Sequence, residues 1–120
     1  MATIEARMTS SRLPGKPMME VCGRPMLGHL VDRLKTVKSI DVIVLATTTN
    51  QTDDVMVEYA SNIGIEVFRG DEFDVMGRVV AAGMSVEADV IVEITGDCPI
   101  IDPEIIEQAI RLYKENTYEY

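Results

Sequence analysis

A segment near the start of the sequence gathers residues that could bind an anion. It reads ARMTSSRLPGKPM over residues 6–18 and carries Arg7, Arg12 and Lys16 among hydroxyl side chains. Arginine can hold two phosphate oxygens at once, lysine supplies a compact charge, and backbone near Gly15 can approach an oxygen without a Cβ in the way. The segment is too polar for a core. Two interpretations remain: a solvated surface loop, or a binding loop for a strongly anionic ligand.

The distribution of charge bears on this choice. The 120-residue chain has a net charge of -9. Residues 1–40 nevertheless hold seven lysines and arginines against three acids, whereas residues 41–120 hold four against seventeen. The overall acidity argues against nucleic acid or an anionic membrane as a partner. The local positive excess indicates a small polyanion bound near the N-terminus.

A second polar motif, TGDCPIID at residues 95–102, follows an apolar run. At the end of such a strand, Asp97 could bind a hard cation such as Mg²⁺, which would neutralise phosphate charge. For Asp97 alone, a turn aspartate is the simpler interpretation, and Asp102 before Pro103 is typical of a helix start. The sequence contains neither GxxxxGK[ST] nor GxGxxG, so the two common phosphate-binding signatures do not apply.

The rest of the pattern predicts the elements that must position these loops. Short apolar runs alternate with helical stretches along the chain. We expect strands at residues 1–6, 41–47, 65–70 and 89–95. We expect helices that open at residues 23–25 with Pro25 in the first turn, follow the polar stretch 48–53 and end at Gly64, run from 74 to 86, and start at 102–103. Strands apolar on both faces, alternating with amphipathic helices, indicate an α/β fold: a doubly wound, mainly parallel sheet with helices on both faces.

In such a sheet, ligands bind beyond the carboxyl ends of the strands. This rule selects three loops, at residues 7–16, 47–52 and 96–99. The basic loop and Asp97 should therefore lie at the same edge. Together they are far more specific for a phosphate site than either one alone.

Length and composition limit the remaining classes. With 120 residues and 47% hydrophobic side chains, the sequence predicts a single domain with its own core. No apolar run reaches the roughly 18 residues of a membrane span, and no signal peptide is visible. Cys22 and Cys98 lie far apart and favour a reducing cytoplasm, with Cys98 as a packed thiol. His29 is the only histidine, so no zinc pattern is present.

Five segments in order along the chain resemble the sugar-activating cytidylyltransferases: ARMTSSRLPGKPM, GRPMLGHLVDRLK, VIVLATTTN, VFRGDEFDVMGR and VEITGDCPIIDPEII. The resemblance is to the acylneuraminate and KDO cytidylyltransferase group, and most closely to its spore coat polysaccharide biosynthesis branch. It implies a Rossmann-like nucleotidyltransferase fold of the nucleotide-diphospho-sugar transferase type. It also implies a reaction in which an oxygen of a sugar or sugar acid attacks the α-phosphate of CTP, giving a CMP-sugar and pyrophosphate. Mg²⁺ as cofactor and a homodimer are further implications.

The resemblance assigns roles to individual residues. The triphosphate loop of the family is matched by Arg7, Ser10, Ser11, Arg12 and Lys16, with Gly15 beside the lysine. Lys16 corresponds to an essential lysine and Asp97 to the aspartate that holds Mg²⁺, so Arg7, Lys16 and Asp97 form the expected catalytic set. Ala46 and Thr47 fall where the family cradles the nucleoside, and Arg78 falls in the segment near the base.

The sequence also departs from the family pattern. Members are about twice as long, so residues 1–120 are expected to be a single nucleotide-binding domain, the truncated N-terminal half of a longer enzyme. Glu5 stands where a neutral amide is usual, and Gly77 where an acid is common before Arg78. The alternative is a non-catalytic nucleotide- or sugar-phosphate-binding module completed by a partner chain. A receiver-like domain fits poorly, because it needs an acidic pair after the first strand, where this chain has bases.

Overall fold

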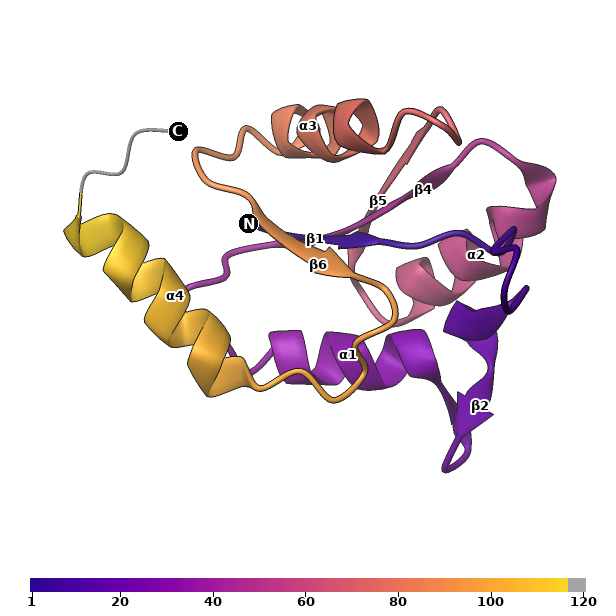
Figure 1. The fold of residues 1–120 in the computed structure, drawn as a ribbon, viewed down its shortest axis with the longest axis horizontal. Helices are drawn as coiled ribbons and strands as arrows, with labels where there is room; N and C mark the ends of the chain where they lie inside the picture. The colour runs from indigo at the N-terminus through magenta and orange to yellow at the C-terminus, as the bar shows by residue number, and fades with distance from the viewer. Residues whose placement is uncertain (117–120) are drawn as a thin grey trace.

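A four-stranded parallel sheet forms the centre of the computed structural model, which describes residues 1–116 (Figure 1). The strands are β1 (Ala2–Glu5), β4 (Ile43–Thr48), β5 (Glu66–Gly70) and β6 (Val92–Thr95), and they lie in the order β5-β4-β1-β6. The chain moves outward from β1 through β4 to β5 and then returns to place β6 on the other side of β1. This reversal between β1 and β6 is a topological switch point, where sheets of this kind bind ligands.

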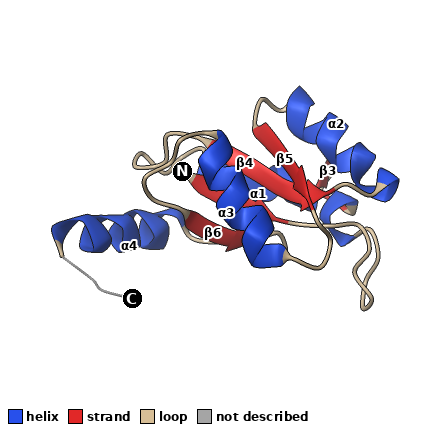
Figure 2. Ribbon diagram, turned by 90° about the horizontal axis from the view of Figure 1, so that it is seen from above, coloured by secondary structure: helices blue, strands red, loops and turns tan. Residues whose placement is uncertain are grey.

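Helices cover both faces of the sheet, which confirms the predicted doubly wound α/β fold (Figures 1 and 2). On one face lie α1 (Met26–Leu34), α2 (Asp54–Asn62) and α4 (Pro103–Glu115), and on the other lies α3 (Val75–Ser85). Two single-turn 3₁₀ helices, η1 (Lys16–Met18) and η2 (Gln51–Asp53), lie in the loops after β1 and β4. Among the described residues, no helix is both long and apolar enough to cross a membrane.

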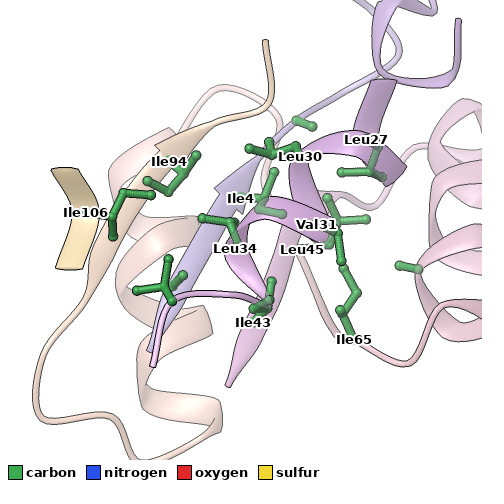
Figure 3. Close-up of a cluster of buried hydrophobic side chains, with 14 of the residues drawn as sticks. Ile4, Leu27, Leu30, Val31, Leu34, Ile43, Leu45, Ile65, Ile94 and Ile106 are labelled. Carbon is green, nitrogen blue, oxygen red and sulfur yellow. The ribbon is translucent and has the colours of Figure 1, made fainter. Parts of the chain in front are cut away.

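The main core lies between the sheet and α1 (Figure 3). Side chains alternate between the two faces of a strand, so Ile4, Leu45 and Ile94 point from three neighbouring strands to the same side. They meet the apolar stripe of α1, which consists of Leu27, Leu30, Val31 and Leu34. The smaller cluster on the α3 face includes Val44, Ala46 and Ala82. Packing on both faces holds each strand in one position along its axis. It therefore also positions the loops that follow the carboxyl ends of the strands.

The structure corrects several predicted boundaries. Residues 20–25 form an antiparallel hairpin of β2 (Glu20–Val21) and β3 (Arg24–Pro25), so α1 begins only at Met26 and Pro25 precedes it. The hairpin loop has φ 51° at Cys22 and φ 76° at Gly23, as in a two-residue turn with both residues left-handed. The last strand begins at Val92, opposite Ala2, rather than at residue 89, and β4 begins at Ile43 rather than at residue 41.

The predicted helix ends are confirmed at three positions. Asp102 caps α4 by accepting a hydrogen bond from the Glu104 amide at 2.9 Å, with Pro103 in the first turn. Asp74 caps α3 in the same way, through the Gly77 amide at 2.8 Å. Gly64 follows α2 in the left-handed region, with φ 71°.

Candidate functional site

The pairing of β1 with β6 brings the two predicted loops together. The strands run parallel with Glu5 opposite Thr95, so the chain leaves both at the same edge of the sheet. The Gly96 amide continues the ladder by donating to the Glu5 carbonyl at 2.8 Å. A Cβ at Gly96 would lie 2.8 Å from that carbonyl oxygen and 2.7 Å from the Ala6 Cβ. Only glycine permits this approach, which explains the glycine that precedes Asp97 in the second motif.

A cavity of about 220 Å³ opens between the two loops. Its walls come from the end of β1, the basic loop and the end of β6, through Glu5, Ala6, Arg7, Ser10, Arg12, Lys16, Pro17, Thr95, Gly96 and Asp97. The prediction that the basic loop and Asp97 share one edge of the sheet is therefore confirmed. Ser11 is exposed outside this lining, and Gly15 supports the loop through backbone contacts.

The three cations of the loop differ in how strongly they are engaged. The Lys16 Nζ lies 3.1 Å from the Asp97 Oδ2, and the two side chains are 25% and 45% exposed. The Arg7 Nη1 lies 3.2 Å from the Glu72 carbonyl and 3.4 Å from its Oε1. Arg12 makes no hydrogen bond or ion pair with any residue that the structure describes. The cavity is thus cationic, with part of that charge balanced by acids.

Asp97 is a residue of the cavity that could hold Mg²⁺. A hydrogen bond from Lys16, with a second from Thr95, holds the pKa of Asp97 below its ordinary value, so the carboxylate is ionised at neutral pH. The described residues contain no cluster of three or more side chains that could hold a metal by themselves. Mg²⁺ commonly keeps several waters and binds one or two carboxylates together with substrate phosphates. Two carboxylates line the cavity, Glu5 and Asp97, and Glu5 is paired with Arg78, so Asp97 beside the loop cations fits that mode of binding.

The basic loop is held in place by Asp53, which the sequence reasoning missed. This buried carboxylate accepts hydrogen bonds from the Met8 amide at 2.8 Å, the Thr47 hydroxyl at 2.9 Å and the Thr48 amide at 3.1 Å. Burial by itself would raise the pKa of Asp53, but the hydrogen bonds, that from the Thr48 hydroxyl foremost, outweigh it and leave the pKa lowered. The Gly15 amide closes the loop on the Met8 carbonyl at 2.9 Å.

Glu72, in the loop after β5, is a second missed residue. Its carboxylate accepts hydrogen bonds from the Thr9 hydroxyl, from the Asn50 Nδ2 at 2.7 Å and from Arg7. The bonds from Thr9 and Asn50 hold the pKa of Glu72 below its ordinary value. These contacts tie the basic loop to the loops after β4 and β5, so three strand ends position it.

The residues assigned to the nucleoside lie next to the cavity wall rather than in it. Ala46 and Thr47 are fully buried in β4, and Arg78 is only 2% exposed. The Arg78 guanidinium donates to the carbonyls of Asp71 at 2.6 Å and Ala46 at 3.3 Å, and it pairs with the Glu5 Oε1 at 3.3 Å. Arg78 therefore balances the charge of Glu5, the acid that departs from the family pattern.

Comparison with known proteins agrees with this geometry. A sequence model described as cytidylyltransferase matches residues 1–120. The chain belongs to the cytidylyltransferase family.

Individual cytidylyltransferase relatives match over nearly the whole of this chain. It is 36% identical over 121 residues to the spore coat polysaccharide biosynthesis protein SpsF of Bacillus subtilis, covering 98% of this chain and 50% of that protein. A solved cytidylyltransferase from Leptospira borgpetersenii superposes with a TM-score of 0.92 at 38% identity, covering 97% of this chain and 49% of that one. The solved structure of CMP:2-keto-3-deoxy-manno-octonic acid synthetase in complex with CTP superposes with a TM-score of 0.82 at 28% identity. The match covers 96% of this chain and 47% of that one. The chain spans about half the length of the curated relatives it matches.

One expectation about this cytidylyltransferase chain is wrong. Cys98 is exposed, not packed in the core, because it lies in the loop beyond the sheet edge, with its Sγ 3.4 Å from the Thr95 hydroxyl. Cys22 is also exposed, in the turn of the hairpin.

Proposed function

We propose that this chain is the nucleotide-binding half of an enzyme that transfers CMP from CTP to a sugar or sugar acid and releases pyrophosphate. One observation carries the proposal: the cationic loop and Asp97 form one cavity at the switch point between β1 and β6. The family match and the similarity to a synthetase solved with CTP support CTP as the nucleotide.

Arg7, Arg12 and Lys16 would bind the triphosphate. In-line displacement at the α-phosphate leaves negative charge on the departing pyrophosphate, and preorganised cations lower the energy of that charge. Ser10 lines the same cavity and can donate a hydrogen bond to a phosphate oxygen. The contacts to Asp53 and Glu72 hold the loop in shape before the ligand arrives, so less ordering is needed on binding.

Asp97 would hold Mg²⁺. When bound, the ion would neutralise phosphate charge and orient the triphosphate. The Lys16 and Thr95 hydrogen bonds keep the carboxylate ionised and aimed at the cavity.

The acceptor sugar would bind outside this cavity. Ligand pockets usually measure about 300–1,000 Å³, whereas the cavity measures about 220 Å³ and is lined almost entirely by the two phosphate-site loops. This volume suits a polyphosphate better than a nucleotide together with a sugar. The alternative, a non-catalytic nucleotide-binding module completed by a partner chain, rests on the same observation and predicts binding without turnover.

We propose a cellular setting on the basis of the relatives and the cysteines. Similarity to SpsF supports a role in surface or spore coat polysaccharide synthesis, and two free thiols suit the cytoplasm. A homodimer in the cytoplasm is the assembly that the family resemblance implies, and it remains part of this proposal.

Calorimetric titration tests the proposed function. Wild type should bind CTP with Mg²⁺ more tightly than it binds cytidine. Lys16→Ala should weaken CTP binding by roughly 1.5–3 kcal/mol, the usual contribution of a charge-assisted hydrogen bond, and leave cytidine binding unchanged. Lys114→Ala, an exposed lysine on α4, is the matched control and should change neither. An equal loss for CTP and cytidine in Lys16→Ala would show that the loop does not bind phosphate.

A further inference from the structure

The Lys16–Asp97 ion pair spans the cavity itself. Lys16 comes from the loop after β1 and Asp97 from the loop after β6, and both line the cavity between those loops. The Nζ and Oδ2 lie 3.1 Å apart. The carboxylate therefore neutralises the ammonium and accepts one of its three N–H donors, so it competes with a phosphate oxygen for Lys16.

Asp97 differs from the other acid that engages a cation of the basic loop. Glu72 also accepts from a loop cation, Arg7, but it does not line the cavity. Arg12 has no partner among the described residues and remains available to an anion. Glu5 also lines the cavity, but its carboxylate pairs with Arg78 rather than with a cation of the basic loop. Asp97 is thus the carboxylate that both neutralises a loop cation and presents its own charge to the ligand.

A metal-free polyphosphate faces two costs at this pair. It must compete with Asp97 for the charge of Lys16, and it must lie next to that carboxylate, a charge of the same sign. A divalent cation that arrives with the polyphosphate removes both costs, because it draws the carboxylate to itself and leaves the ammonium to the phosphate. Such an arrangement favours metal-bound over metal-free polyphosphate because it weakens the binding of the metal-free form.

We infer that Asp97 is a selectivity residue that blocks Lys16 against metal-free polyphosphate and releases it when a divalent cation enters with the ligand. The inference rests on the proposed function, which assigns this cavity to a polyphosphate. It gives Asp97 a role in the free protein in addition to the metal-holding role in the complex.

Calorimetry with inorganic pyrophosphate, with and without Mg²⁺, tests the inference. Wild type should bind metal-free pyrophosphate weakly and should gain about tenfold in affinity when Mg²⁺ is added. Asp97→Asn should bind metal-free pyrophosphate about tenfold more tightly than wild type and should gain little from Mg²⁺. Asp89→Asn removes the same charge from an exposed position away from the cavity and controls for net charge.

The double variant Lys16→Gln/Asp97→Asn tests whether the tighter binding of metal-free pyrophosphate by Asp97→Asn depends on Lys16. If it does, this increase in affinity should disappear in the double variant. The inference is overturned if Asp97→Asn binds metal-free pyrophosphate no more tightly than Asp89→Asn does. It is also overturned if the increased affinity for metal-free pyrophosphate persists in the double variant. These outcomes are separate from the test of CTP against cytidine. A wild type that prefers CTP with Mg²⁺, without a gain in Asp97→Asn, would retain the proposed function and lose only the blocking role.

Discussion

At the scale of single residues, Asp53 shows how one buried carboxylate organises the binding loop. It accepts hydrogen bonds from Met8 in the loop and from Thr47 and Thr48 at the end of β4. Asp53→Asn replaces an acceptor with a donor at one oxygen, leaves buried donors unpaired and should lower the free energy of unfolding by about 1–3 kcal/mol. Urea denaturation would measure the change, and Glu58→Gln, an exposed acid on α2, should change it by less than about 0.5 kcal/mol.

The same residue predicts a pH dependence. Because the pKa of Asp53 is lowered in the folded protein from an ordinary value of 3.8, its contribution is fully present above that value and is lost as the pH falls through the lower folded pKa. The stability difference between wild type and Asp53→Asn should therefore be constant near neutral pH and shrink below about pH 4. Urea midpoints measured down to pH 3 would show this, whereas a constant difference over the whole range would contradict it.

At the scale of elements, the packing of α1 on the sheet holds the strands in position, and with them the loops at their carboxyl ends. Leu30 is fully buried against Ile4 and its neighbours (Figure 3). Leu30→Ala should destabilise the protein by about 2–5 kcal/mol through lost burial and the cavity left behind. The same substitution at Leu112, 52% exposed on α4, is the matched control and should cost less than about 1 kcal/mol. Similar losses at the two leucines in thermal or urea unfolding would refute this assignment of the core.

Some elements could be predicted from the sequence because their signals are local. The stripe of α1, the caps at Asp102 and Gly64 and the apolar strands depend on neighbouring residues only. The hairpin at residues 20–25 was missed because its strands have two residues each, too few for alternation to show. Its turn did offer a signal, because a glycine at the second position of a two-residue turn, here Gly23 after Cys22, is typical of a tight hairpin.

Part of the candidate site could likewise be predicted from the sequence, and part could not. Its cationic loop and Asp97 stand out because residue type and position after a strand are visible in the sequence. The contacts of Glu72 with Thr9, and of Arg78 with Glu5, join residues more than 60 positions apart and have no local signal. The burial of Arg78 follows from the carbonyls that surround it, which only the folded chain brings together.

At the scale of the whole molecule, the small cavity predicts binding without turnover by this 120-residue chain. Holding an attacking oxygen in line supplies about 7–11 kcal/mol of the barrier to such a transfer, and the residues that line the cavity come almost entirely from the two loops proposed to bind phosphate and Mg²⁺. We expect no release of pyrophosphate when the chain is incubated with CTP, Mg²⁺ and candidate sugar acids. Release at ordinary enzyme rates would show that these residues also contain the acceptor site.

The central claim is that the cavity between β1 and β6 binds the triphosphate of CTP, and amide NMR shifts during a titration with CTP and Mg²⁺ test it most directly. The largest shifts should fall in residues 7–16 and at Gly96 and Asp97, which lie on and around the cavity. Cytidine should leave these amides nearly unchanged. Shifts confined to the opposite end of the sheet, around the cavity lined by Met1, Val86 and Lys114, would contradict the claim.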